Sequence, residues 1–92
     1  MSIRIYNDNN NKEIESLCED IWDLPTQIYE LEKWLNLNGN ILPRNKYVAD
    51  IGFDIRKDAT GGGTDINIEM INMLSNIGMR ILLSEYPNMN KL

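Results

Sequence analysis

The stretch "KYVADIGFDIRKDATGGGTDINIEMINMLSNIGMRILLSEY", residues 46–86, carries the strongest structural signals of the chain. Residues 46–56 alternate apolar and polar side chains, with the period of two that is typical of a β-strand. Residues 67–77 repeat apolar side chains at helical spacing and end at Gly78, and residues 79–86 alternate again. Two strands joined so closely by a helix predict a crossover connection, with the strands parallel and adjacent in one sheet.

The N-terminal half predicts further elements. Residues 2–6 indicate a short strand that pairs at either edge of the sheet, and residues 7–12 indicate a turn. Residues 13–24 gather apolar side chains on one side of a helical wheel and acidic side chains on the other, which predicts an amphipathic helix. Because Pro25 is tolerated in a first helical turn but not in a helix interior, a second helix is expected over residues 25–36.

Together these elements predict a single domain, residues 1–92, of the α+β (or α/β) class. We expect two layers, with about three strands in one sheet and three helices packed mainly on one face. An alternative hairpin, which pairs residues 50–57 with residues 64–68, would shorten the third helix. The N-terminus lacks the pattern of a secretory signal, and no apolar run approaches the ~20 residues of a membrane span, so a cytoplasmic protein without a membrane partner is expected.

Charge is distributed unevenly along the chain. The net charge of −5 argues against a surface that neutralises phosphates, so no nucleic-acid partner is expected. Between residues 13 and 32 no residue is basic, and the acidic residues there are Glu13, Glu15, Glu19, Asp20, Asp23, Glu30 and Glu32. One part of the molecule is therefore expected to be an acidic patch.

Residues suited to catalysis are scarce. The chain has no histidine, so it has no Ser-His or Cys-His pair and no histidine metal ligand. Cys18, the only cysteine, is interpreted as a small core residue. Asp50, Asp54 and Asp58 suggest a metal site, because hard cations take oxygen ligands. Residues four apart on a strand are separated by about 13 Å, too far to share one ion, so these residues are interpreted as ordinary polar-face aspartates. We expect no enzyme activity, no catalytic residue, no metal and no cofactor.

The glycine triplet Gly61–Gly63 raises the question of a phosphate-binding loop. A Walker-type loop needs a lysine followed by serine or threonine after its glycines, whereas Thr64 and Asp65 follow here. The triplet is better interpreted as a turn with positive φ, followed by a helix cap at Thr64, Asp65 or Asn67.

Residues 47–87 resemble a family of small uncharacterised bacterial α/β domains. The likeness lies in a strand with an "IGF" step, a glycine-rich loop, a helix stopped by glycine and a last strand that ends in "SEYP". The resemblance implies the fold but no catalytic residue. The small size, the acidic charge and the absence of histidine are also similar to the immunity proteins of bacterial polymorphic or contact-dependent toxin systems, which bind a cognate toxin and block it.

The expected function is therefore that of a non-enzymatic binding protein, an immunity-type inhibitor of a cognate bacterial toxin such as a nuclease. Acidic residues would speed encounter with a cationic partner and aromatic residues would anchor it. One alternative is an anion- or ligand-binding domain or enzyme that uses Gly61–Gly63 with Arg56 and Lys57, and another is an accessory subunit that forms a homo-oligomer. The candidate partner-binding residues are Glu15, Glu19, Asp20, Trp22, Asp23, Tyr29, Glu30 and Trp34.

Overall fold

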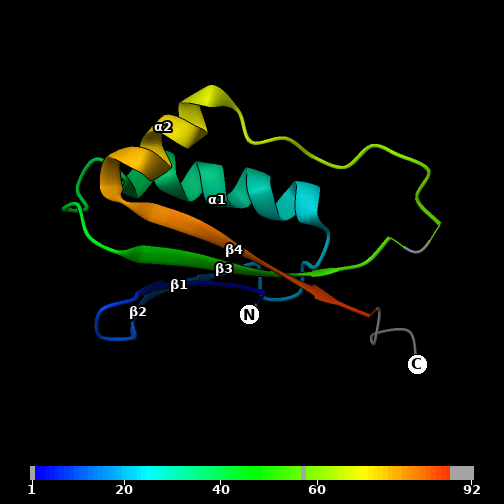
Figure 1. The fold of residues 1–92 in the computed structure, drawn as a ribbon, viewed down its shortest axis with the longest axis horizontal. Helices are drawn as coiled ribbons and strands as arrows, with labels where there is room; N and C mark the ends of the chain where they lie inside the picture. The colour runs from blue at the N-terminus through cyan, green and yellow to red at the C-terminus, as the bar shows by residue number, and fades with distance from the viewer. Residues whose placement is uncertain (1, 57, 88–92) are drawn as a thin grey trace.

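The computed structural model describes residues 2–56 and 58–87, which form a four-stranded sheet covered by two helices (Figure 1). The elements, in chain order, are β1 (Ile3–Asn7), β2 (Lys12–Leu17), α1 (Leu24–Asn38), β3 (Tyr47–Asp54), α2 (Ile68–Ile77) and β4 (Met79–Tyr86). Neither helix in this described part of the chain is long and apolar enough to cross a membrane.

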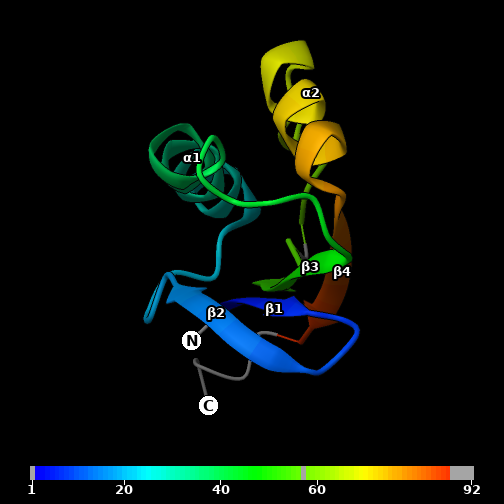
Figure 2. The ribbon, with the colours of Figure 1, turned by 90° about the vertical axis from the view of Figure 1, so that its left-hand side faces the viewer.

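The strand order in the sheet is β2-β1-β3-β4. β1 is antiparallel to both of its neighbours, while β3 and β4 are parallel and joined through α2, as the crossover prediction requires. Both helices lie on one face of the sheet, α1 nearer to β2 and α2 nearer to β4 (Figure 2). β1 is thus an interior strand, where the sequence indicated an edge.

Residues 12–17 form a strand, so the amphipathic helix predicted over residues 13–24 was wrong. β2 pairs with β1 so that Ile3 lies opposite Leu17 and Ile5 lies opposite Glu15. The helical wheel did not account for the free backbone edge of β1, whose N–H and C=O groups gain partners from this segment. The fold is therefore α+β in two layers, with four strands and two helices among the described residues instead of about three of each.

The other predicted elements are confirmed to within a few residues at their ends. α1 begins after Asp23, whose carboxylate accepts a hydrogen bond from the backbone N–H of Thr26, and Pro25 lies in its first turn. α2 begins after Asn67, whose side chain accepts from Met70 N at 2.8 Å. The alternative hairpin through residues 64–68 was wrong, because residues 64–67 pair with no strand and residue 68 starts α2.

The core lies between the helices and the sheet. On the sheet side the core is formed by side chains of β1 and β3 and by Met79 of β4. On the opposite side it is formed by side chains of the two helices at helical spacing. Its buried apolar members are Ile3, Ile5, Ile28, Leu31, Trp34, Leu35, Tyr47, Ala49, Ile51, Met70, Leu74, Ile77 and Met79.

The connection between β2 and α1, residues 18–23, is held to the end of the sheet by polar contacts. Gln27, which is completely buried, donates its side-chain amide to Gly52 O at 2.6 Å and to Ile21 O at 3.2 Å. The Ser2 hydroxyl lies 2.6 Å from the same Ile21 oxygen. Asp54 N donates to Trp22 O at 2.9 Å, so this irregular segment continues the hydrogen bonding of the sheet beyond β1.

We expect Gln27→Leu to lower the free energy of unfolding by about 1 kcal/mol, because Gly52 O loses a buried donor while the side-chain volume is nearly kept. Ile21 O keeps the Ser2 hydroxyl as a donor, and removal of Gln27 Oε1, which is buried without a partner among the described residues, offsets part of the cost. Urea unfolding followed by circular dichroism measures the change. Asn36→Ala, at an exposed position of the same helix, is the control and should have a much smaller effect. Equal stability of the two variants would show that the Gln27 contacts do not hold the connection.

Gly78 and the glycine triplet should respond differently to alanine. Gly78 ends α2 with φ of 84°, and an added Cβ would collide with the backbone oxygen of Asn45. Gly61 has φ of 136° but no atom within 4 Å of such a Cβ. We expect Gly78→Ala to cost more than about 2 kcal/mol of unfolding free energy and Gly61→Ala about 1 kcal/mol, measured in the same urea titration. A larger cost for Gly61→Ala would contradict this account.

Candidate functional site

The fold separates the acidic run of residues 13–32 into three groups. Glu13 lies 3.3 Å from the Arg4 guanidinium in an ion pair. Glu32 is directed toward α2, where its carboxylate accepts from the Asn67 side-chain amide at 2.8 Å. The run therefore does not form one continuous face.

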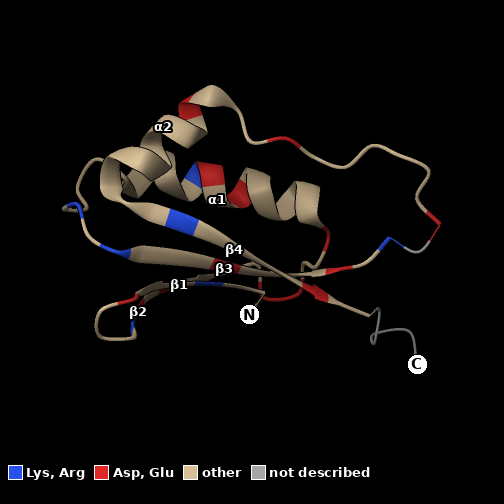
Figure 3. Ribbon diagram, viewed as in Figure 1, with Lys and Arg blue, Asp and Glu red and all other residues tan. Residues whose placement is uncertain are grey.

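Five carboxylates remain at the β2 side of the molecule, and we refer to Glu15, Glu19, Asp20, Asp23 and Glu30 as the acidic flank. Glu15 lies opposite the core residue Ile5 and therefore on the helix-bearing side of the sheet. Glu19 and Asp20 are exposed in the connection that follows β2. None of the five forms an ion pair with a basic residue in the described part of the chain. Figure 3 shows the acidic stretch ahead of α1, with several basic residues at the opposite end of the sheet.

Cys18 follows β2 directly and is partly buried against the core. Burial raises the pKa of the Cys18 thiol, and the negative charges of Glu30 and Asp23 raise it further. Of these two charges, one belongs to α1, which contains Glu30, and the other to its N-cap, Asp23. Because the thiolate is disfavoured, Cys18 is poorly suited to nucleophilic chemistry.

The candidate aromatic residues differ in exposure. Tyr29 is 62 % exposed on α1. Trp34, which the sequence also offered as a partner-binding candidate, is only 9 % exposed and belongs to the core. Trp22 is half-buried and packs edge to face with Tyr86, with ring centroids 5.9 Å apart. Trp22 and Tyr29 are thus the aromatic candidates that retain accessible surface.

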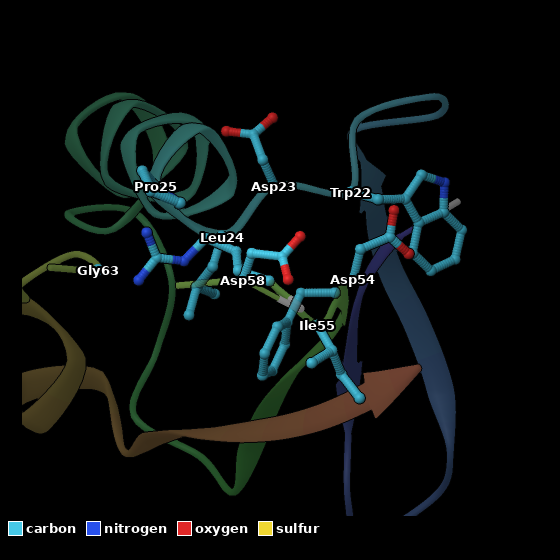
Figure 4. Close-up of a pocket in the computed structure, with 10 residues that line it drawn as sticks. Trp22, Asp23, Leu24, Pro25, Asp54, Ile55, Asp58 and Gly63 are labelled. Atoms are coloured by element: carbon cyan, nitrogen blue, oxygen red, sulfur yellow. The ribbon is translucent and has the colours of Figure 1, made fainter. Parts of the chain in front are cut away.

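A pocket of about 770 Å³ adjoins the acidic flank. It lies between the N-terminus of α1, the end of β3 and the glycine loop, and Figure 4 shows the lining residues that these segments contribute. Asp23 belongs both to the flank and to the pocket. The lining residues are Trp22, Asp23, Leu24, Pro25, Phe53, Asp54, Ile55, Arg56, Asp58 and Gly63.

The glycine triplet reaches this pocket through Gly63, which is one of its lining residues. Gly61, Gly62 and Gly63 all have positive φ, as predicted, and the Arg56 guanidinium donates to Gly61 O at 3.0 Å. The cap of the following helix is Asn67, one of the three predicted candidates. Lys57, the other basic residue of the anion-binding alternative, lies outside the described residues.

The start of α2 is poorly suited to an anion. The Asn67 side chain already accepts from Met70 N, and the Glu32 carboxylate is bound to the same Asn67 amide. Glu69 adds a further carboxylate in the first turn. An incoming phosphate would therefore meet negative charge where a phosphate loop offers free N–H groups.

Sequence reasoning missed most of the pocket. Asp54 and Asp58 were interpreted as ordinary polar aspartates, and Leu24 and Phe53 as apolar positions of regular elements. The available signal was positional, because ligand sites favour the carboxyl ends of parallel strands and β3 ends here.

Comparisons with protein-family models, with curated proteins and with solved structures find no match.

The approach of Glu30 to Cys18 predicts a change in thiol reactivity. We expect Glu30→Gln to raise the rate of iodoacetamide alkylation of Cys18 at pH 8, because removing a nearby negative charge lowers the pKa of the thiol and raises the thiolate fraction. Glu32→Gln is the matched control, since Glu32 faces Asn67 instead. Mass spectrometry follows the reaction, and equal rates for the two variants would contradict the placement of Glu30.

Proposed function

We propose that the protein is a non-enzymatic binding protein that inhibits a cationic protein partner, most concretely as the immunity protein of a basic bacterial toxin such as a nuclease. The observation that carries this proposal is the acidic flank, five carboxylates without an ion pair among the described residues, adjoining a pocket with aromatic and aliphatic walls. This arrangement combines a charged surface for encounter with an apolar recess for close contact.

The physical basis is charge complementarity. A surface rich in unpaired carboxylates accelerates diffusional encounter with a cationic partner and repels nucleic acid. A nuclease must itself present a positive surface to bind phosphates, so an acidic protein bound there would compete with its substrate. Trp22 and the exposed Tyr29 provide the kind of aromatic surface that often contributes most to such interfaces.

The ligand-binding alternative has weaker support. Its anion would have to enter a pocket that three carboxylates line, Asp23, Asp54 and Asp58, against the single guanidinium of Arg56 among the described residues. The Arg56 guanidinium already donates to the loop that it would share with the anion. These contacts favour a cationic partner over a phosphate or nucleotide.

The inhibitor proposal predicts protection of cells. We expect the protein encoded by the neighbouring reading frame to arrest bacterial growth when it is expressed alone, and we expect co-expression of this chain to restore growth. Colony counts measure the outcome. Growth arrest that persists although both proteins are made and soluble would overturn the inhibitor role.

Charge reversal at the flank tests the surface. We expect the double variant Glu19→Lys, Asp20→Lys to slow association with that partner by about tenfold or more at low salt and to weaken its salt dependence, measured by stopped-flow mixing. Asp23 is left intact because its carboxylate caps α1. The control Asp65→Lys, Glu69→Lys makes the same charge change at the α2 end and should associate at nearly the unmodified rate.

A further inference from the structure

We infer that the pocket at the N-terminus of α1 holds one basic side chain, an arginine or a lysine, of the bound partner. This inference rests on the proposed function and specifies how the partner is anchored. The pocket of about 770 Å³ has ample room for one such side chain, and it adjoins the acidic flank through Asp23.

The apolar lining suits the stem of such a side chain. Leu24 and Pro25 come from the first turn of α1, while Phe53 and Ile55 come from the end of β3 and the residue after it. Arginine and lysine carry three or four methylene groups that pack against apolar surface while the charged end reaches polar partners. Phe53 and Trp22 also line the pocket, and aromatic rings attract cations.

The polar lining suits the charged end. In Figure 4 the Asp23 carboxylate, which caps α1, points away from Asp54 and Asp58. Asp54 and Asp58 have no side-chain hydrogen bond or ion pair with another described residue, so their carboxylates are free to accept from a guanidinium or ammonium group. Arg56 offsets part of this charge, but its guanidinium is bound to Gly61 O.

The first experiment uses a small probe in place of the partner. N-acetyl-arginine amide is titrated into ¹⁵N-labelled protein, with N-acetyl-citrulline amide as the neutral probe of nearly the same shape. We expect the arginine probe alone to shift the amides of residues 22–24 and 53–56. The double variant Asp54→Asn, Asp58→Asn should lose these shifts, whereas the control Asp65→Asn, Glu69→Gln should keep them.

Two results of the titration would overturn the inference. Equal shifts with the citrulline probe would show that the pocket does not select a cation. Shifts at the same amides with inorganic phosphate, and none with the arginine probe, would assign the pocket to an anion. An unchanged amide spectrum outside the pocket confirms that the Asp54→Asn, Asp58→Asn variant is folded, so a loss of shifts in that variant reports on the pocket itself.

The partner complex then separates this inference from the proposed function. If a basic side chain of the partner occupies the pocket, the double variant Asp54→Asn, Asp58→Asn should raise the dissociation rate of the complex by about tenfold. The association rate should change much less, because desolvated charge pairs act mainly on dissociation. Reversal of Glu19 and Asp20 acts on association instead. Unchanged dissociation of the pocket variant would overturn the pocket assignment and leave the inhibitor role intact, whereas an absence of any complex overturns the proposed function.

Discussion

The buried side-chain amide of Gln27 connects a helix, an irregular segment and a strand of this fold. Its two donor contacts join α1, the irregular connection at Ile21 and the β3 backbone at Gly52. A buried carbonyl without a donor is unfavourable, so the position of the connection and the position of the helix depend on each other. The acidic flank and the pocket both lie around this junction, and their geometry therefore depends on an uncharged side chain that neither of them contains.

The sequence predicted the C-terminal half of the fold well because local signals and tertiary structure agree there. Alternation in β3 and β4, helical spacing in α2 and the stop at Gly78 all correspond to observed elements. The N-terminal half was harder, because residues 13–24 carry a helical apolar pattern that competes with strand pairing. Pairing with β1 decides the outcome, and periodicity along one segment contains no information about a free strand edge elsewhere.

The sequence predicted the acidic charge of the candidate site but not which residues line its pocket. Glu19, Asp20 and Asp23 remain accessible in a surface without described ion pairs, whereas Glu13 and Glu32 are drawn away by Arg4 and Asn67. The first contact crosses the β1–β2 pair, and the second joins α1 to the N-cap of α2, 35 residues away in the sequence. The pocket likewise combines residues 22–25 with residues 53–56, Asp58 and Gly63, and only the meeting of α1 with the end of β3 brings them together.

Because β1 is an interior strand, it needs a partner strand on each side before its backbone hydrogen bonds are complete. β1 precedes every other element, yet it is complete only when it is flanked by β2, its neighbour in sequence, and by β3, from the other half of the chain. The β1–β2 hairpin can form early, but by itself a two-stranded hairpin is marginally stable in water. The sheet therefore closes late, by a long-range contact of the kind that slows folding, and during synthesis the unpaired edge of β1 must wait for β3 to leave the ribosome.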